Sequence, residues 1–374
     1  MTKRPGIHQI AELANVSIGT VDRALHERPG INDATRQRVL RIAQELRYQP
    51  NRAARALSGR RAKIRVGVCM PREIRFFYDQ LWDGIYEEAR RYADFGIEFL
   101  YSPVQELGEG ETRELKKILA SGVQGVILTP GNPVETAPLI DHAEEEDVRV
   151  ICISTDAPTS KRSSVICVEP RLNGMLAGEL LAKFVSPGSR VAIITGMLRT
   201  EDHSRKVQGF TSSFPQYCRD GTIVEVIEGH EDEDESFQKT FELLGRIPDL
   251  AGIYVNTVNC VPVCRALGAR KLAGEIRVIT TDLFLEMVPY FEKGTICASI
   301  YQRPYQQGRL AVTTLVEHLM SNAPLHPTNY LNPSIVLGSN LHLFREIRLA
   351  KQSPVAAQIL PEPDSCLPSL SRNA

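Results

Sequence analysis

Aromatic residues make up only 6% of this sequence of 374 residues, and long apolar runs are missing from it. No run approaches the roughly 20 apolar residues that a membrane-spanning helix needs. The start of the chain is followed by no apolar segment of the kind found in secretory signal peptides. These absences predict a soluble α/β protein of the cytoplasm with no membrane partner.

The usual signatures of enzymes are also missing. We find no G-x-G-x-x-G after the first predicted strand, no P-loop, no G-x-S-x-G and no cluster spaced to ligate a metal. Cys260 and Cys264 are close in sequence, but their spacing suits neither a zinc knuckle nor a redox pair. We therefore predict no catalytic residue, no metal and no cofactor, and we expect the cysteines to be buried free thiols.

Charge is divided unevenly along the chain. Up to Arg65 there are 14 Lys and Arg against 5 Asp and Glu, a net charge of +9, whereas the remainder has 30 against 40, a net charge of −10. A basic head on an acidic body is typical of a nucleic-acid-binding module joined to another domain. A merely solvated basic face is the alternative.

The head has the pattern of a helix-turn-helix. Residues 7–14 and 18–25 carry apolar side chains at helical spacing, and Ser17 can cap the second helix by accepting a backbone N–H. A third helix begins at Asn32 or Asp33. An ordinary amphipathic helix in a small bundle is the alternative for the second helix. Four of its residues are free to meet a partner outside the domain: Ile18, Gly19, Asp22 and Arg23.

Residues 48–59 predict a short hinge helix. Pro50 suits its first position and Gly59 its end, and a helix of about two turns is marginal alone, so we expect it to form only on DNA. Leu57, beside small alanines, can wedge between base pairs from the minor groove. A plain flexible linker is the alternative.

Across the first sixty residues these motifs keep one register. They read Ile10-Ala11-x-x-Ala14-x-Val16-Ser17-x-x-Thr20-Val21-x-Arg23, then Thr35-Arg36-x-x-Val39, then Tyr48-x-Pro50-Asn51-x-x-Ala54-x-x-Leu57. The series closely resembles the DNA-binding head and hinge helix of the LacI/GalR family of bacterial transcription regulators. The resemblance implies a DNA-binding set of Ser17, Ile18, Gly19, Thr20, Asp22, Arg23, Asn51, Arg52, Ala54 and Leu57.

Two positions of this set depart from the family pattern. Ile18 and Gly19 stand where the main base-reading pair lies, yet they offer no side-chain hydrogen bond, so readout there should rest on thymine methyls and DNA shape. Asp22 replaces the usual serine, and it lies near phosphates unless it orients Arg23 or accepts from a cytosine amine. Arg23 matches a basic contact suited to a guanine edge.

Between residues 63 and 345, apolar runs of β type alternate with helical patterns. Near-continuous strands of this kind predict parallel sheets covered on both faces, and their number predicts two doubly wound lobes. The strands are expected at 64–70, 97–100, 123–128, 148–153, 190–195, 223–227, 252–255 and 277–280, and helices at 78–92, 173–185, 237–244 and 304–320.

Polar residues follow the strand ends in both halves, where doubly wound sheets bind ligands. Carboxylates, amides and an arginine beside flat aromatic rings suit a polyhydroxylated ring; for any single residue, capping or loop solvation is the alternative. The body is similar to the effector-binding body of the same family and to type I periplasmic sugar-binding proteins. The similarity implies effector contacts from Phe76, Phe77, Asp156, Arg205, Asn256, Asp282 and Gln302.

Two of these assignments have neighbours that fit as well. Lys206 or Ser204 can hold the place given to Arg205, and Asn259 competes with Asn256. The five consecutive acidic residues at 231–235 are interpreted as a solvated loop or helix start.

The expected architecture is a small all-α head with an α/β body. Its parts are a helix-turn-helix domain (1–49), a hinge (50–62), a two-lobed effector domain (63–345) and a disordered tail (346–374). Lobe 1 takes about 63–168 and 302–328, and lobe 2 about 169–301 and 329–345.

These features predict a sequence-specific DNA-binding transcription regulator, a repressor, that binds operator DNA as a homodimer or higher oligomer. A small-molecule effector bound between the lobes controls it. We expect this effector to be a pentose or hexose; the alternatives are a nucleobase, a phosphorylated sugar and a protein co-regulator. The alternatives are a sugar-binding protein without regulatory activity, for which the head makes no sense, and an enzyme on a doubly wound fold.

Overall fold

The computed structural model describes residues 7–25, 30–46, 64–72 and 76–344. The chain divides into a small unit, the head, which ends at Lys63, and a large unit, the body, each described here by itself. The predicted hinge and tail, with Asn51, Arg52, Ala54 and Leu57, lie outside the described residues.

The head is a three-helix bundle, as the apolar spacing predicts. Its helices are α1 (Ile7–Ala14), α2 (Ile18–Leu25) and α3 (Asp33–Glu45). Ser17 Oγ accepts the Thr20 N–H at 3.2 Å, and Asn32 caps α3 by accepting the Thr35 N–H at 2.7 Å. The buried core is small and aliphatic, made of Ile10, Ala11, Ala14, Val21, Ala24, Val39 and Ala43.

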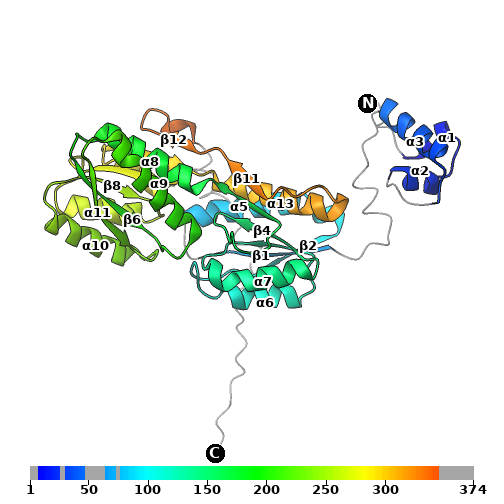
Figure 1. The fold of residues 1–374 in the computed structure, drawn as a ribbon, viewed down its shortest axis with the longest axis horizontal. Helices are drawn as coiled ribbons and strands as arrows, with labels where there is room; N and C mark the ends of the chain where they lie inside the picture. Colours follow the sequence, from blue (N-terminus) through cyan, green and yellow to red (C-terminus); the bar gives the residue numbers. More distant parts are fainter. Residues whose placement is uncertain (1–6, 26–29, 47–63, 73–75, 345–374) are drawn as a thin grey trace, which may run out of the picture. The chain divides into compact units, whose positions relative to one another are not determined.

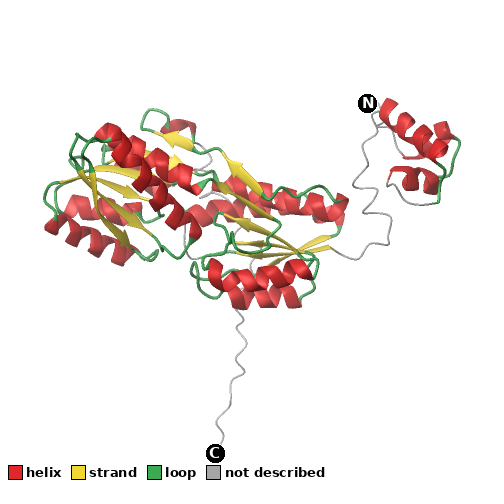
Figure 2. Ribbon diagram, in the orientation of Figure 1, coloured by secondary structure: helices red, strands yellow, loops and turns green. Residues whose placement is uncertain are grey.

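The body consists of two lobes, each a sheet with helices on both faces (Figures 1 and 2). Lobe 1 has the strand order β11-β5-β4-β3-β1-β2, all parallel. Its strands are β1 (Ile64–Cys69), β2 (Ile97–Tyr101), β3 (Gly125–Leu128), β4 (Arg149–Ile153), β5 (Ser164–Val168) and β11 (Thr328–Leu331). Its helices are α5 (Phe77–Arg90), α6 (Glu111–Ala120), α7 (Pro133–Glu145) and α13 (Pro304–Ser321).

Lobe 2 repeats this plan with the order β12-β10-β9-β8-β6-β7, in which β12 alone is antiparallel. Its strands are β6 (Arg190–Thr195), β7 (Thr222–Glu228), β8 (Leu250–Val255), β9 (Arg277–Thr281), β10 (Ile296–Tyr301) and β12 (Ser334–Val336). Its helices are α8 (Pro170–Phe184), α9 (Glu201–Tyr217), α10 (Glu233–Arg246), α11 (Cys260–Ala269) and α12 (Val288–Glu292).

The chain passes between the lobes three times. It leaves lobe 1 after β5, returns after β10 and crosses again between β11 and β12. Because β11 pairs with β5, the last stretch of lobe 1 extends to Leu331, close to the boundary at about residue 328 that the sequence indicated. The strand expected at 123–128 is shorter, since Val123 and Gln124 precede β3.

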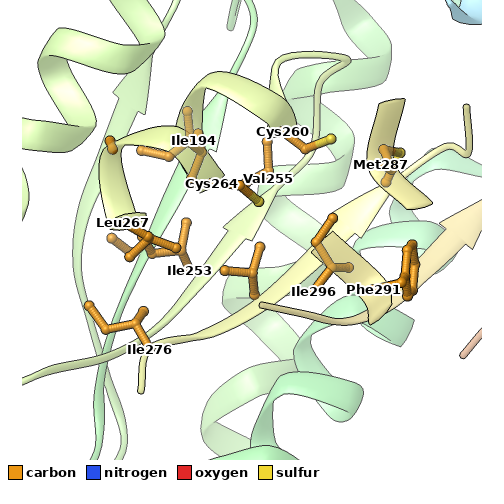
Figure 3. Packing of buried hydrophobic residues seen from close by; sticks show 14 of the residues in the cluster. Ile194, Ile253, Val255, Cys260, Cys264, Leu267, Ile276, Met287, Phe291 and Ile296 are labelled. Carbon is orange, nitrogen blue, oxygen red and sulfur yellow. The ribbon is translucent and has the colours of Figure 1, made fainter. Parts of the chain in front are cut away.

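Two of the cysteines lie in the apolar core of lobe 2 beside α11 (Figure 3). Cys260 and Cys264 lie one turn apart on α11, fully buried against Ile253, Val255 and Ile194. The seven cysteines in the described part of the chain are all free thiols. Six of them are buried and act as small apolar side chains in close-packed cores, whereas Cys297 is half-buried.

Glycines let two pairs of helices approach closely. A Cβ at Gly84 of α5 would lie 2.1 Å from the Tyr305 carbonyl oxygen of α13, and one at Gly308 would lie 2.3 Å from the Leu81 carbonyl oxygen. In lobe 2, α8 and α9 meet in the same way at Gly174 and Gly209. Each lobe therefore has a helix crossing whose backbones leave no room for a side chain.

Within the described ranges no helix is long and apolar enough to cross a membrane.

Candidate functional site

Polar side chains from both lobes line one small space, which we call the inner chamber. They follow the carboxyl ends of β4, β6, β7, β8, β9 and β10, the edge at which doubly wound sheets bind ligands. The chamber has a volume of about 30 Å³, which holds water but no sugar ring. Its lining is Phe77, Tyr78, Leu107, Ser154, Thr155, Thr200, Asp202, His203, Lys206, Glu231, Asn256, Thr257, Val258, Asp282 and Gln302.

The first turns of α9 supply three neighbouring groups of the lining. Asp202 and Lys206 are one turn apart, and Lys206 Nζ donates to Asp202 Oδ2 at 2.6 Å. Lys206 is only 1% exposed, so this ion pair is buried. His203 Nδ1 accepts the Met197 N–H at 3.0 Å, which leaves its Nε2 to carry the proton.

That proton faces a carboxylate. His203 Nε2 lies 3.3 Å from Glu231 Oε1, and the hydroxyl of Thr257 donates to the other oxygen of Glu231. Asn256 Nδ2 donates to the His203 carbonyl at 3.2 Å, and Asn256 Oδ1 is buried with no hydrogen-bond partner in the structure. Loop residues after β7 and β8 thus close one wall of the chamber around α9.

Asp282 and Gln302 form the opposite wall. Gln302 Nε2 donates to Asp282 Oδ1 at 2.9 Å, while its own Oε1 accepts from Asn173 Nδ2 at 3.2 Å. Burial raises the pKa of Asp282 to about 7, the negative charges of Asp202 and Glu231 add to this rise, and Lys206 and Gln302 oppose it. Asp282 therefore exchanges a proton near neutral pH.

Left-handed backbone gathers around the chamber. Ser154, Glu231 and Asp282 have φ values of 72°, 58° and 71°, a region that non-glycine residues rarely adopt. Each of the three lines the chamber directly after or near a strand end. Strain concentrated in this way is a mark of functional sites.

The two lobes are also hydrogen-bonded to each other beside the chamber. Thr200 Oγ1 donates to the Gly131 carbonyl at 2.8 Å, and Thr155 Oγ1 accepts the Asp202 N–H at 3.2 Å. Gln80 of α5 donates to the Leu283 carbonyl of lobe 2 at 2.9 Å. These bonds hold the cleft closed.

The structure brings four of the seven predicted effector residues to the chamber: Phe77, Asn256, Asp282 and Gln302. Phe76 instead stacks on Phe284 of lobe 2, with ring centroids 4.2 Å apart. Asp156 points away from the lining and is held by both nitrogens of the Arg162 fork.

Arg205 is likewise a correction. Successive residues of a helix are turned by about 100°, so Lys206 faces the chamber and Arg205 faces solvent, where its Nε donates to Glu201 Oε1 at 2.6 Å. The lysine that the sequence left as an alternative is therefore the lining residue. Asn256 lines the chamber, whereas Asn259 does not.

Several lining residues were not predicted. Glu231 belongs to the acidic run interpreted as a solvated loop or helix start; Asp232 does cap α10, but the side chain of Glu231 is only 7% exposed. The other polar additions are Tyr78, Ser154, Thr155, Thr200, Asp202, His203 and Thr257. A helical wheel of α9 could have found Asp202, because it lies one turn from Lys206.

In the head, α2 presents Ile18, Gly19 and Arg23 as exposed residues and Thr20 as half-buried. Asp22 lies on the same helix. The surface predicted to read DNA is thus free of the head's own core. Among the described residues, no three His, Cys, Asp or Glu side chains gather so that they could hold a metal ion.

Two family models match the chain. Residues 66–323 match the model described as "Periplasmic binding protein domain", and residues 6–51 match "Bacterial regulatory proteins, lacI family". Together they span the head and nearly all of the two-lobed body.

Curated relatives include two bacterial regulators. Catabolite control protein A of Priestia megaterium is 27% identical over 259 residues, which are 67% of this chain and 73% of that protein. The HTH-type transcriptional regulator DegA of Bacillus subtilis is 25% identical over 272 residues, which are 72% of this chain and 77% of that protein.

Solved structures share the fold of the body. GanP, a glucose-galactose binding protein from Geobacillus stearothermophilus, has a TM-score of 0.69 at 26% identity and matches 75% of this chain and 99% of its own. A solute binding protein from Bacillus halodurans with bound myo-inositol has a TM-score of 0.70 at 17% identity and matches 77% of this chain and 99% of its own.

Proposed function

The chain belongs to the lacI family of bacterial regulatory proteins, with a periplasmic binding protein domain as its body, and from this premise we propose how it senses and acts. It is a DNA-binding transcription regulator whose body has a fold of the sugar-binding type. We propose that it is a repressor of the cytoplasm, that it catalyses no reaction, and that a sugar-like effector in the inner chamber controls it.

The convergence of polar side chains from both lobes on one chamber carries the effector proposal. Carboxylate and amide groups at Asp282, Gln302 and Asn256 can bind adjacent hydroxyls, while the ring of Phe77 can cover the C–H side of a sugar. Because the chamber as described has room for water only, an effector enters while the lobes are apart, and the lobes then close around it less far than they do here.

On the DNA side, we propose a homodimer. Two copies of α2 would enter successive major grooves of a near-palindromic operator, with Ile18 and Gly19 against base edges and Arg23 on a guanine. The exposure of these residues and the match of residues 6–51 to the lacI family support the proposal.

The effector acts by favouring one arrangement of the lobes. A ligand shifts a conformational equilibrium only by the difference in its affinity for the two states. Closure of the hinged lobes on an effector is such a difference, since groups on both lobes then contact it at once. We propose that closure changes how the two heads of a dimer meet the operator.

Binding of the full-length protein to genomic fragments tests both halves of the proposal. One set of fragments should bind well above random duplex, and one member of a panel of pentoses and hexoses should change that affinity. Absence of any preferred fragment contradicts the regulator, and absence of any effect of the panel contradicts the sugar-like effector.

A pair of variants separates the chamber from its surroundings. Asn256→Ala should abolish the response to the active sugar and keep DNA binding, because Asn256 lines the chamber. Arg205→Ala should keep both, because Arg205 faces solvent. Equal loss of response in both variants would remove the chamber from the mechanism.

A further inference from the structure

The inner chamber carries more negative than positive charge. Three carboxylates line it, Asp202, Glu231 and Asp282, against the single lysine Lys206 among its described residues. Lys206 is already paired with Asp202. His203 adds no charge in the tautomer set by its bonds, since Nδ1 accepts a backbone N–H and Nε2 carries the one proton.

Among the described residues, the groups that bond to Glu231 are neutral. Its side chain is 7% exposed, and its partners are the imidazole of His203 and the hydroxyl of Thr257. A buried carboxylate without a cation is costly. The closed chamber therefore has a place for a positive charge beside Glu231.

Two hydrogen-bond acceptors of the lining also lack donors. Asn256 is 1% exposed and its Oδ1 has no partner, while its Nδ2 is fixed on the His203 carbonyl, so the amide cannot turn round without losing that bond. Asp202 Oδ1 is unpartnered as well. Buried polar atoms are normally satisfied, so a ligand that fits here donates to both oxygens.

A second cavity, which we call the outer cavity, adjoins the chamber and shares Leu107 and Glu231 with it. It measures about 620 Å³. Among its described lining residues the acidic ones outnumber the basic ones: Glu106, Glu109, Glu228, Glu231, Asp232 and Glu235 face Arg199 and His230. A cavity lined mainly by one sign of charge concentrates ions of the opposite sign.

Resting on the effector site proposed above, we propose that the effector is cationic: a small polyhydroxylated molecule with a protonated amine, such as an amino sugar. The ammonium group donates to Asn256 Oδ1 and Asp202 Oδ1 and neutralises Glu231, and hydroxyls reach Asp282 and Gln302. The proposal excludes a phosphorylated sugar, because its phosphate would face the carboxylates of the inner chamber or those of the outer cavity, both of which Glu231 lines.

The proton on Asp282 gives an independent readout. Without a cation, the chamber limits its negative charge by holding Asp282 protonated up to about neutral pH. An incoming ammonium replaces that proton, so binding of the effector at pH 6.5 releases a proton. Binding of a neutral sugar leaves the proton in place.

The test is calorimetric titration of the full-length protein with matched sets in the gluco, galacto and manno series. Each set contains the hexose, its 2-amino-2-deoxy form and its 6-phosphate. At least one amine should bind at least about ten-fold more tightly than its hexose, with no binding of the phosphate. Repeating the titration in buffers of different ionisation enthalpy measures the proton released.

Charge variants complete the experiment. Glu231→Gln should weaken binding of the amine at least about ten-fold more than it weakens binding of the hexose. Glu145→Gln, an exposed site outside both cavities, should alter neither.

Each other result overturns the inference. A hexose that binds as tightly as its amine, any 6-phosphate that binds more tightly, or failure of all three amines to bind at millimolar concentration does so. A neutral sugar that still alters DNA binding leaves the proposed function standing, whereas DNA binding that responds to no probe counts against the proposed function itself.

Discussion

At the scale of single residues, Asp282 makes the stability of the folded protein depend on pH. In the folded protein the carboxyl group of Asp282 stays protonated up to about pH 7, whereas in the unfolded chain it loses its proton near the ordinary pKa of 3.8. Between these values the folded state binds more protons than the unfolded state, so stability falls as pH rises and levels off above pH 7. This direction is opposite to that of a carboxylate in a salt bridge.

We expect this contribution of Asp282 to the free energy of unfolding to fall by about 2 kcal/mol between pH 5 and pH 7. Asp282→Asn should remove it and flatten the profile, as measured by urea unfolding at several pH values. The exposed substitution Asp94→Asn should keep the wild-type profile. Identical profiles for Asp282→Asn and the wild type would contradict the raised pKa.

Arg23 is the residue of the head whose removal should change sequence preference. On an exposed face of α2 it can bind a guanine edge with two bonds, worth about 1–3 kcal/mol of discrimination. Arg23→Ala should weaken binding to selected fragments by that amount and hardly change binding to random duplex. Arg41→Ala on α3 is the control: Arg41 is exposed but lies outside the predicted base-reading set, so its removal should change binding to both kinds of DNA equally.

At the scale of helices, the crossing of α5 and α13 depends on missing side chains. Gly84→Ala should destabilise lobe 1 by about 1–3 kcal/mol, because its Cβ would lie 2.1 Å from the Tyr305 carbonyl oxygen and the helices would have to move apart. Urea unfolding measures the change.

Gly268 of α11 is the matched control. No atom lies within 4 Å of a Cβ built there. Gly268→Ala should therefore leave stability unchanged or raise it by up to about 1 kcal/mol, through helix propensity alone. Equal destabilisation at both glycines would show that close approach is not what Gly84 permits.

The secondary-structure elements differ in how well the sequence predicted them. The strands built from Val and Ile runs, such as β4 and β6, were predicted because burial on both faces demands such runs. The short edge strands β11 and β12 were not predicted, since they pair through backbone contacts made at the third crossing. The buried strand β5 was not predicted either, although its sequence is apolar. The close approach of Gly84 to α13 depends on a partner more than 200 residues away and has no local signal.

The candidate site was likewise predicted only where a local sequence signal marks its residues. Asp282, Gln302 and Asn256 directly follow strands, so the carboxyl-end rule finds them. Choosing Lys206 over Arg205 needs the rotation of α9 to within one residue, and Glu231 looks like any residue of an acidic loop. Asp156 follows its strand as expected, but Arg162 later in the same loop binds it first.

At the scale of the whole molecule, we expect the hydrogen bonds between the lobes to favour a closed form over an open one. Thr200→Val removes the bond to the Gly131 carbonyl and spares α9, whose start receives no side-chain cap from Thr200. Losing about 1 kcal/mol from closure should weaken effector binding several-fold and raise the radius of gyration measured by X-ray scattering without effector.

Thr222→Val, at an exposed position of β7, provides the comparison for that variant. It should change neither quantity, because Thr222 lies outside the chamber lining. Closure would be independent of the Thr200 bond if both variants scattered like the wild type.

A chamber of about 30 Å³ also has a consequence in time. A bound effector cannot diffuse out until the lobes part, so its dwell time equals the waiting time for a spontaneous opening. When the concentration of free effector in the cell falls, the regulator stays in its effector-bound state for that interval. The rate at which the lobes open then sets how long the response lasts. Variants that make opening easier, such as Thr200→Val, should shorten the dwell time of the effector.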